Sequence, residues 1–507
     1  MNQSGFQEEC DAFALKMDRL IITKDYSALK LYLKETKTFA ESHHLPEYAQ
    51  IFYSIGNGYS LLENLKDLSE KERLEYEKQT IYYLREAMYL MEQRKDNSVL
   101  MASIYTNYAN ELFDRYRVIE ALRFYRRAIS LEPNFGMALG NYGRALSFYA
   151  NLVNNENEYD ALHCYAYQSF KKALEVNDSN VYEGARKAFE RRIEEYQQFQ
   201  SEEYLLASIV YSDYVCENTS ERAYRQWCLE QHLFLNPLND LMNLETAFAY
   251  DPLTIANYTE TERDKKAGEP SEPPRWYAML NQIKEEYIYA RFLYYKSTQE
   301  KQKVHYADKD VKLADYDGIG YSIRLEQLKS SFRILYSIFD QVAFAVNAFW
   351  ELNFPERYAD ASHIFDEKAR VPRIDSFHND FLKRAEYNRA LMALYWSHLD
   401  FTKQFEKSEF ASDKELKDLR NAFEHKFVKV HVDQKGKDTP KKLKIENDDF
   451  YHISEEQLES YTFRLLQLAR EWIMELVYAI NIERERVAPS SPTIHLRVFD
   501  YDDGLKL

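Results

Sequence analysis

The chain has 507 residues, a formal net charge of −17 at pH 7, 42 Tyr and 30 Phe, but only 12 Gly and 12 Pro. So few helix breakers over this length predict long helices, and strand-like alternation of Val, Ile and Thr is nearly absent. The composition therefore predicts an all-α fold. The negative charge excludes non-specific binding of nucleic acid over the whole surface, so any such contact must be local.

The sequence predicts a cytoplasmic protein without a membrane segment. Residues 1–11 are polar and acidic, which is unlike a signal peptide. The most apolar run, 334–350, contains Asp340, Gln341 and Asn347, so we expect a buried helix there rather than a membrane span. No cysteine forms a C-x-x-C pair or lies at metal-ligand spacing from a histidine, which predicts free thiols in a reducing compartment. The four cysteines are Cys10, Cys164, Cys216 and Cys228.

The N-terminal half is predicted to be a helical repeat. Residues 6–43 have the pattern of a helical pair, and a repeat begins at Pro46. The clearest copy spans 102–133, with bulky, bulky, small and bulky residues in its first helix and Ala, aromatic, Ala and Pro in its second. These positions are Tyr105, Tyr108, Ala109, Leu112, Ala121, Tyr125, Ala128 and Pro133. Small residues let the two helices approach closely, and the proline ends the second helix.

These positions resemble the tetratricopeptide (TPR) repeat. The resemblance covers about residues 45–180, with two stretched copies that carry polar insertions between their helices, and residues 181–250 are expected to continue as helices. A TPR solenoid implies a concave surface that grips a peptide or partner protein. The alternative is a scaffold that only orients the other domain or makes a dimer. The insertions are either partner contacts or plain loops.

A proline-dense stretch separates the two halves. Residues 264–274 combine mixed charge with Pro270, Pro273 and Pro274, which excludes a helix there. We therefore expect a TPR-like domain at 1–262, a linker at 263–275 and a second domain at 276–507.

The second domain is predicted to be a bundle of long helices. Apolar residues recur every three or four positions over its helical segments. Ser412 and Glu415 form a capping-box pattern that opens one of the helices. The expected helices are 276–299, 321–353, 378–406, the helix after Ser412 and 454–483, with loops at 354–375 and 430–449.

One of these helices carries a set of side chains suited to phosphate chemistry. Asn421 and His425 lie one turn apart on one face, and the long side chain of Arg420 can reach the same face. Leu419, Phe423 and Phe427 are expected to mark the buried side. Arginine binds a phosphodiester and its developing negative charge, while histidine moves a proton near neutral pH. The plain alternative is a helix with a surface arginine and a half-buried histidine.

Arg420, Asn421 and His425 match the R-x4-6-H motif and so resemble HEPN domains, which are all-helical modules of many toxin and host-defence ribonucleases. The resemblance covers roughly residues 320–485, as the domain core, and is similar to bacterial HEPN domains fused behind TPR repeats. It implies RNA cleavage without a metal ion or other cofactor to a 2′,3′-cyclic phosphate, with Arg420 and His425 as catalytic residues. It also implies a homodimer, in which two copies of the motif share one cleft.

Supporting residues follow from the same resemblance. Asp340, on the predicted helix 321–353, is expected to orient His425 or pair with Arg420, unless it forms a structural ion pair elsewhere. The position two residues after the motif histidine, a Tyr in AMPylated HEPN domains, is Phe427 here. That kind of regulation is therefore not supported.

A cluster of lysines follows the motif. Residues 426–444 hold seven lysines against Asp433 and Asp438, which suits RNA backbone binding, although a solvated loop is the alternative. The lysines are Lys426, Lys429, Lys435, Lys437, Lys441, Lys442 and Lys444.

The predicted function is a metal-independent HEPN endoribonuclease, a toxin or host-defence effector whose TPR half senses a partner. The sequence contains no metal-ligand cluster and no phosphate-binding glycine-rich loop. The alternative function is a non-catalytic adaptor that uses the HEPN bundle for dimerisation or for nucleotide or RNA binding.

Overall fold

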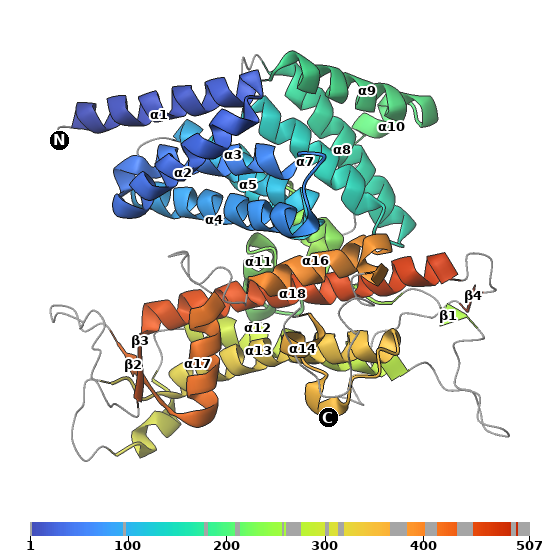
Figure 1. Ribbon diagram of the computed structural model, residues 1–507. Coiled ribbons are helices and arrows are strands. Elements are labelled where there is room, and N and C mark those ends of the chain that lie inside the picture. The colour runs from blue at the N-terminus through green and yellow to red at the C-terminus, as the bar shows by residue number, and fades with distance from the viewer. Residues whose placement is uncertain are drawn as a thin grey trace. The chain divides into compact units, whose positions relative to one another are not determined.

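The residues that the structure describes lie mainly in helices (Figure 1). The computed structural model describes residues 3–94, 98–176, 181–207, 213–255, 258–259, 275–299, 304–312, 319–365, 383–400, 413–432, 450–487 and 493–494. These divide into two compact units, the first holding 1–210, 240–242 and 399–414, and the second 211–239, 243–398 and 415–507. The all-α prediction is confirmed.

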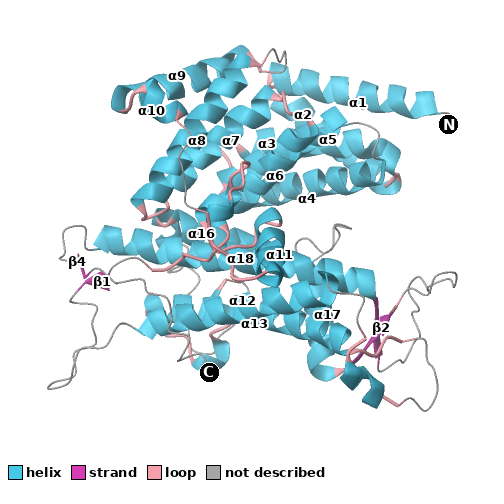
Figure 2. Ribbon diagram, turned by 180° about the vertical axis from the view of Figure 1, so that it is seen from behind, coloured by secondary structure: helices cyan, strands magenta, loops and turns pink. Residues whose placement is uncertain are grey.

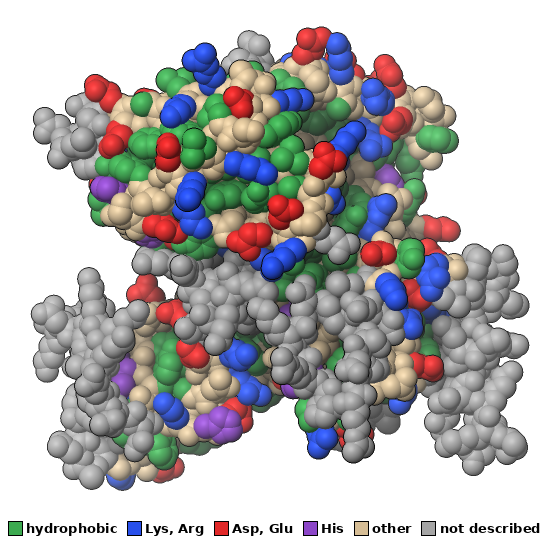
Figure 3. Space-filling model, in the orientation of Figure 1, with side chains coloured by type: hydrophobic (Ala, Val, Ile, Leu, Met, Phe, Trp, Pro, Cys, Tyr) green, Lys and Arg blue, Asp and Glu red, His purple; other side chains and the backbone are tan. Residues whose placement is uncertain are grey.

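The first unit is a series of paired helices. Helix α3 packs on α4, α5 on α6 and α7 on α8, and α6 also packs on α7, so each pair extends the stack of the one before it. The helices are α1 (Gln3–Thr23), α2 (Tyr26–Ser42), α3 (Ala49–Glu63), α4 (Glu70–Arg94), α5 (Ser98–Asp114), α6 (Val118–Leu131), α7 (Gly136–Ala150), α8 (Glu156–Glu175), α9 (Glu183–Phe199) and α10 (Glu202–Leu206), with a 3₁₀ turn at Pro46–Tyr48. Charged side chains of both signs are interspersed with apolar ones over its visible face (Figure 3).

Glycine allows the close approach expected within these pairs. A Cβ atom on Gly56 of α3 would lie 2.9 Å from Leu84 Cγ of α4. A Cβ on Gly143 of α7 would lie 3.0 Å from the carbonyl oxygen of Ala166 in α8. Both distances are shorter than ordinary van der Waals contact, so a side chain at either position would push the two helices apart.

A buried ion-pair cluster ties a late segment of the chain into the first unit. Asp400 is 2% exposed, and its carboxylate lies 2.8 Å from Arg85 Nη2 and 2.8 Å from Arg117 Nη2. Glu120 pairs with Arg117 and, at 2.8 Å, with Arg123. Buried carboxylates of this kind require such partners, because an unpaired charge away from water is strongly unfavourable.

The second unit is a helical bundle with three long helices at its centre. Helices α12 (Arg275–Gln299), α13 (Ile323–Phe349) and α18 (Glu455–Val487) run side by side and pack on one another (Figure 1). Trp472 of α18 is 1% exposed, and its ring lies 4.9 Å from that of Phe339. The shorter helices are α11 (Thr219–Glu230), α14 (Ala361–Ile364), α16 (Arg389–Leu399) and α17 (Asp413–His425), with 3₁₀ turns at Pro237–Asp240, Thr246–Phe248, Tyr306–Asp310 and Glu356–Tyr358.

Two buried arginines hold irregular backbone against this bundle. Arg291 of α12 binds the carboxylate of Asp251 at 2.8 and 3.0 Å and donates to the carbonyl oxygen of Leu233 at 2.8 Å. Arg470 of α18 donates to the carbonyl oxygens of Phe234 and Asn236. The expectation that helices continue to residue 250 was therefore wrong after α11, because 231–255 contains only two short 3₁₀ turns and irregular backbone, part of which the two arginines bind.

The expected helix at 378–406 is interrupted. Residues 383–387 are helical, Asn388 is not, and α16 follows. The Asn388 side chain accepts the N–H of Leu391 at 3.1 Å and donates to the carbonyl oxygen of Ala479 at 2.7 Å. An amide that captures a nearby backbone donor starts a new helix instead of continuing the old one.

A small sheet is the main departure from the prediction. Strands β2 (Phe427–His431) and β3 (Phe450–Ser454) pair in parallel and lie next to α17 (Figure 2). The prediction of a loop beginning at Val430 was therefore wrong for residues 430–431, because Val428 and Val430 alternate with longer side chains and form a strand. Strands β1 (Tyr258–Thr259) and β4 (Thr493–Ile494) form a second, antiparallel pair.

The division into units does not coincide with the expected linker. The contacts group 211–239 and 243–255 with the second unit, whereas the linker at 263–275 lies outside the described residues except for Arg275. Across the part of the chain that the structure describes, none of the helices has the length and apolar character needed to cross a membrane.

Candidate functional site

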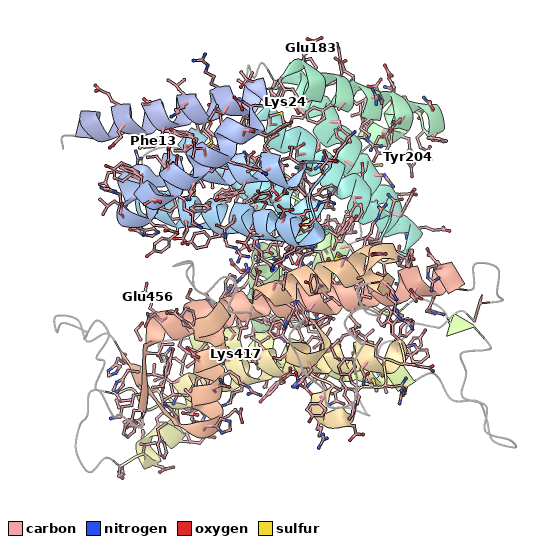
Figure 4. All side chains as sticks on the ribbon, in the orientation of Figure 1. Phe13, Lys24, Glu183, Tyr204, Lys417 and Glu456 are labelled. Atoms are coloured by element: carbon pink, nitrogen blue, oxygen red, sulfur yellow. The ribbon has the colours of Figure 1, made fainter. Side chains whose placement is uncertain are left out.

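The predicted motif lies on α17, marked by Lys417 in Figure 4. Leu416 and Leu419 are fully buried, Ala422 is 2% exposed, and Phe423 packs against Phe332 at a ring distance of 5.3 Å. The apolar residues recur at helical spacing and fix which side of α17 faces the bundle. The opposite side faces solvent and carries Asn421 and His425, while Arg420 is half-buried.

The three motif residues are arranged unequally. Arg420 is half-buried, its guanidinium lies 5.7 Å from the centre of the Tyr336 ring, and its Nη1 donates to Asn421 Oδ1 at 3.2 Å. Asn421 and His425 are both exposed and one helical turn apart. Arg420 and Asn421 are thus brought together, while the imidazole of His425 makes no hydrogen bond to any residue that the structure describes. Lys417, one turn before Asn421, is an exposed cation on the same helical stripe that the sequence analysis missed.

Asp340 lies close to the motif arginine but has another partner. Its Oδ1 accepts the backbone N–H of Ala361 at 3.2 Å, at the start of α14. Burial raises the pKa of Asp340 above its usual value, against the lowering effects of the Ala361 N–H and of the Arg420 guanidinium. Among the described contacts, no hydrogen bond joins Asp340 to Arg420 or to His425. The Arg420 guanidinium therefore acts on the pKa of Asp340, while the hydrogen bond to Ala361 joins Asp340 to the start of α14.

A second histidine near this carboxylate was missed by sequence reasoning. His363 Nδ1 lies 2.8 Å from both carboxylate oxygens of Asp360, which also accepts the His363 backbone N–H at 3.0 Å. Asp360 and His363 both act on the pKa of Asp340, the former raising it and the latter lowering it. An Asp-x-x-His pattern before a short helix is the sequence signal for such a capped pair.

The residues directly after the motif differ from the expectation. Phe427 was expected on the buried side of the helix, but it is 72% exposed and begins β2. The helix ends at His425, so the spacing of four that links Phe427 to Phe423 no longer applies. Lys426 is exposed, and Lys429 is half-buried, with its Nζ 3.8 Å from the centre of the Phe450 ring.

Several predicted features lie outside the described residues. They are Lys435, Lys437, Lys441, Lys442 and Lys444 of the lysine cluster and Ser412 of the expected capping box. Within the described part of the second unit, Tyr461 donates to Glu415 and so joins α17 to α18. Nowhere among the described residues do three or more His, Cys, Asp or Glu side chains form a group able to hold a metal ion.

The first unit contains a separate groove of about 790 Å³, to which α1, α3, α5, α7, α8 and α9 contribute. Asn107 donates to Asn57 Oδ1 at 2.9 Å, and Asn141 donates to Asn110 Oδ1 at 3.0 Å, so amide pairs link α3 to α5 and α5 to α7. Asn107 also donates to Tyr53 Oη at 2.8 Å and Asn110 Oδ1 also accepts from Tyr125 Oη at 2.7 Å, so the donors of Asn107 and the acceptor of Asn110 are already engaged. Charges of both signs flank these amides, including Asp114 and Arg144 at 3.5 Å.

One comparison with known proteins found a match in the C-terminal half of the chain. Residues 267–483 match the family model described as LA2681-like HEPN, and α17 with Arg420, Asn421 and His425 falls within the match. The chain therefore carries a HEPN domain at its C-terminal end. No curated protein and no solved structure matched the chain.

Proposed function

We propose that this protein is a HEPN-type endoribonuclease that cleaves RNA without a metal ion, with Arg420 and His425 as its catalytic residues. One observation carries the proposal: within the HEPN match, α17 carries a half-buried guanidinium beside an exposed amide and, one turn further on, an exposed imidazole. The contact between Arg420 and Asn421 orients the guanidinium toward the stripe that ends at His425. An arginine kept partly out of water over a tyrosine ring interacts more strongly with phosphate than a fully solvated one.

The proposed mechanism divides the chemistry between these side chains. His425 takes the proton of the ribose 2′-hydroxyl or gives one to the leaving 5′-oxygen, while Arg420 stabilises the negative charge on the phosphorane. The 2′-oxygen attacks the adjacent phosphorus as the bond to the 5′-oxygen breaks, which yields a 2′,3′-cyclic phosphate and a 5′-hydroxyl. Proton transfer of this kind contributes about 10²–10⁴-fold to the rate.

A single motif supplies one histidine, whereas the reaction needs both an acid and a base. We propose that two copies of the chain associate through their HEPN domains, so that His425 of each copy faces one shared cleft. The exposure of both Asn421 and His425 supports an arrangement in which a second copy covers α17.

The first unit is proposed to act as a TPR-like sensor. Its asparagine-lined groove is suited to an extended protein segment, because backbone N–H and C=O groups match the donors and acceptors of side-chain amides. Partner binding there would release or align the HEPN dimer, as expected for a toxin or host-defence effector. We propose that the protein is cytoplasmic. Its four cysteines are free, as is usual in a reducing compartment, and its proposed substrate is RNA.

The test is cleavage of RNA by the purified full chain with EDTA present, beside Arg420→Ala, His425→Ala and His305→Ala. His305 is an exposed histidine outside the motif and serves as the matched control. We expect cyclic-phosphate ends from the parent and the control, and a loss of at least 10²-fold in both motif variants. Equal cleavage by all four proteins would show that the activity belongs to a contaminant.

A non-catalytic adaptor is the second candidate, and the groove in the first unit favours it. In that case the HEPN domain would serve dimerisation or nucleotide binding, and the groove would recruit a client protein. The two candidates differ in one result. If the protein is an adaptor, the His425→Ala variant still binds the partner and still dimerises. The parent protein then cleaves no RNA even when the partner is added.

A further inference from the structure

The strand pair that follows the motif has two unlike faces. Val430 and Ile453 are 0% and 3% exposed and point to one side, as alternate residues of a strand must. Tyr451 belongs to this side, and burial, together with the nearby Glu415 and Asp418 of α17, raises its pKa to about 12. The strands thus pack one face onto the bundle. The other face carries Phe427, Lys429 and His431 from β2 and Phe450 and His452 from β3.

The side chains of this open face form a continuous row. Phe427 and Phe450 are cross-strand partners with rings 5.8 Å apart, and they are 72% and 37% exposed. Lys429 lies over the Phe450 ring, with its Nζ 3.8 Å from the ring centre. Beyond it the imidazoles of His431 and His452 stack at 5.1 Å and share a hydrogen bond of 2.9 Å. We call these five residues the ring row.

The composition of the ring row points to one kind of occupant. Neither strand contains an Asp or Glu, and Lys426 and Lys429 add positive charge, although the whole chain has a net charge of −17. Flat aromatic rings stack on bases of any sequence, and ammonium groups attract phosphate. Bases in a duplex are already stacked on each other, so only a single strand can use such a surface. The row also starts two residues after the exposed His425.

We propose that the ring row, led by Phe427 and Phe450, is a stacking platform that holds the bases of single-stranded RNA beside His425. The platform rests on the proposed nuclease function and names its substrate class, unpaired RNA. Bases stacked on the two phenylalanines place the neighbouring phosphodiester next to the motif helix. Lys429, fixed over the Phe450 ring, contacts the backbone of the same strand.

The experiment measures binding of a fluorescent single-stranded 2′-O-methyl oligoribonucleotide, which cannot be cleaved through its 2′-oxygen, to the full-length protein. Phe427→Ala and Phe450→Ala are each expected to weaken binding about tenfold, the effect of losing one stacked base. Phe427→Leu, which stays apolar but has no ring, should lose as much, whereas Phe427→Trp should bind as tightly as the parent. A 2-aminopurine in the strand should lose fluorescence on binding to the parent and not to Phe427→Ala.

The matched control is Phe292→Ala on α12. Phe292 is 42% exposed and has Lys296 Nζ 5.9 Å from its ring centre, so it repeats the exposed phenylalanine and lysine away from the motif. Affinity should be unchanged in this variant. An equal loss in Phe292→Ala, parent-like binding by Phe427→Leu, equal affinity for a duplex of the same sequence, or no binding by the parent would each overturn the proposal.

Measuring RNA binding and RNA cleavage separately distinguishes failure of the platform proposal from failure of the nuclease proposal. If His425→Ala binds the strand normally and no protein cleaves RNA, the platform stands and the nuclease proposal falls. If the parent cleaves RNA and Phe427→Ala cleaves and binds equally well, the platform falls and the nuclease proposal stands.

Discussion

Two arginines show how differently this molecule uses the same side chain. Arg117 in the first unit is 5% exposed and lies between Asp400, at 2.8 Å, and Glu120. Arg420 in the second unit is half-buried, and its one hydrogen bond among the described residues is to the neutral amide of Asn421. Arg117 is neutralised by carboxylates of its own chain. Arg420 keeps its charge available, which is the condition for binding a phosphate from outside.

The two arginines therefore have different roles, one in stabilising the fold and one in the proposed chemistry. A buried guanidinium with two carboxylates stabilises one packing of helices, and removing one member leaves the others unpaired away from water. An arginine whose guanidinium contacts only an aromatic ring and an amide can be replaced by alanine with little effect on the fold. Matched substitutions in the two regions therefore test this difference.

The largest expected effect on stability comes from Arg117→Ala. It leaves Asp400 and Glu120 short of a partner, and we expect the free energy of unfolding to fall by about 3–5 kcal/mol. Arg420→Ala should change it by no more than about 0.5 kcal/mol. Urea unfolding of both variants measures the difference. A similar loss in the two would make Arg420 a structural residue and would remove the contrast.

Lowering the pH should weaken the ion-pair cluster around Asp400 and so distinguish it further from the motif. Burial opposes ionisation of Asp400, yet the guanidiniums of Arg117 and Arg85 hold its pKa below the usual value. A lowered folded-state pKa contributes stability that is present above the unfolded-state value of about 3.9 and is lost as the pH falls through the folded-state pKa. We expect Asp400→Asn to be less stable than the parent at pH 7 and to approach it at pH 3. Asp418→Asn, at an exposed carboxylate of α17, should leave the stability at pH 7 close to that of the parent.

The helices could be predicted because their apolar periodicity is local. The pairs around α3 to α8 and the long helices α12, α13 and α18 all follow from residues three or four apart. The irregular segment 231–255 could not be predicted in this way. It is held by Arg291 and Arg470, which are distant in sequence, and a buried arginine that binds carbonyl oxygens has no local pattern.

The site was predictable to the extent that it lies on one helix. The sequence placed Arg420, Asn421 and His425 along α17 from helical spacing alone, and their catalytic role stays a prediction. It missed Asp360 and His363, because only tertiary packing brings them to Asp340. It also placed Phe427 on the buried side, because nothing in the local spacing marks the change from helix to strand at Lys426. The ring row depends on the pairing of β2 with β3, two strands that are separated by the 18 residues 432–449 of the sequence.

Asp340→Asn tests whether the carboxylate acts on Arg420 or only supports α14. The asparagine keeps an oxygen for the Ala361 N–H and removes the charge, so the fold should be preserved. If the charge positions Arg420, we expect kcat for RNA cleavage to fall about tenfold with KM little changed. Asp340→Ala is the companion, since it also removes the acceptor. A normal kcat in Asp340→Asn with a lower Tm in Asp340→Ala would assign Asp340 to structure alone.

The smallest expected effects belong to the exposed lysines beside the motif. Lys417 and Lys426 lie at either end of the stripe formed by Asn421 and His425, where each can contact one phosphate of a bound strand. Replacing either by alanine should weaken binding of single-stranded RNA only a few-fold. It should also lower the slope of log affinity against log salt concentration by about 0.7, because one counterion fewer is released. Lys34→Ala, at an exposed lysine on α2 of the first unit, is the control. An unchanged slope in Lys417→Ala and Lys426→Ala would mean that the strand leaves the motif helix in another direction, and the contrast with Arg117 would then rest on Arg420 alone.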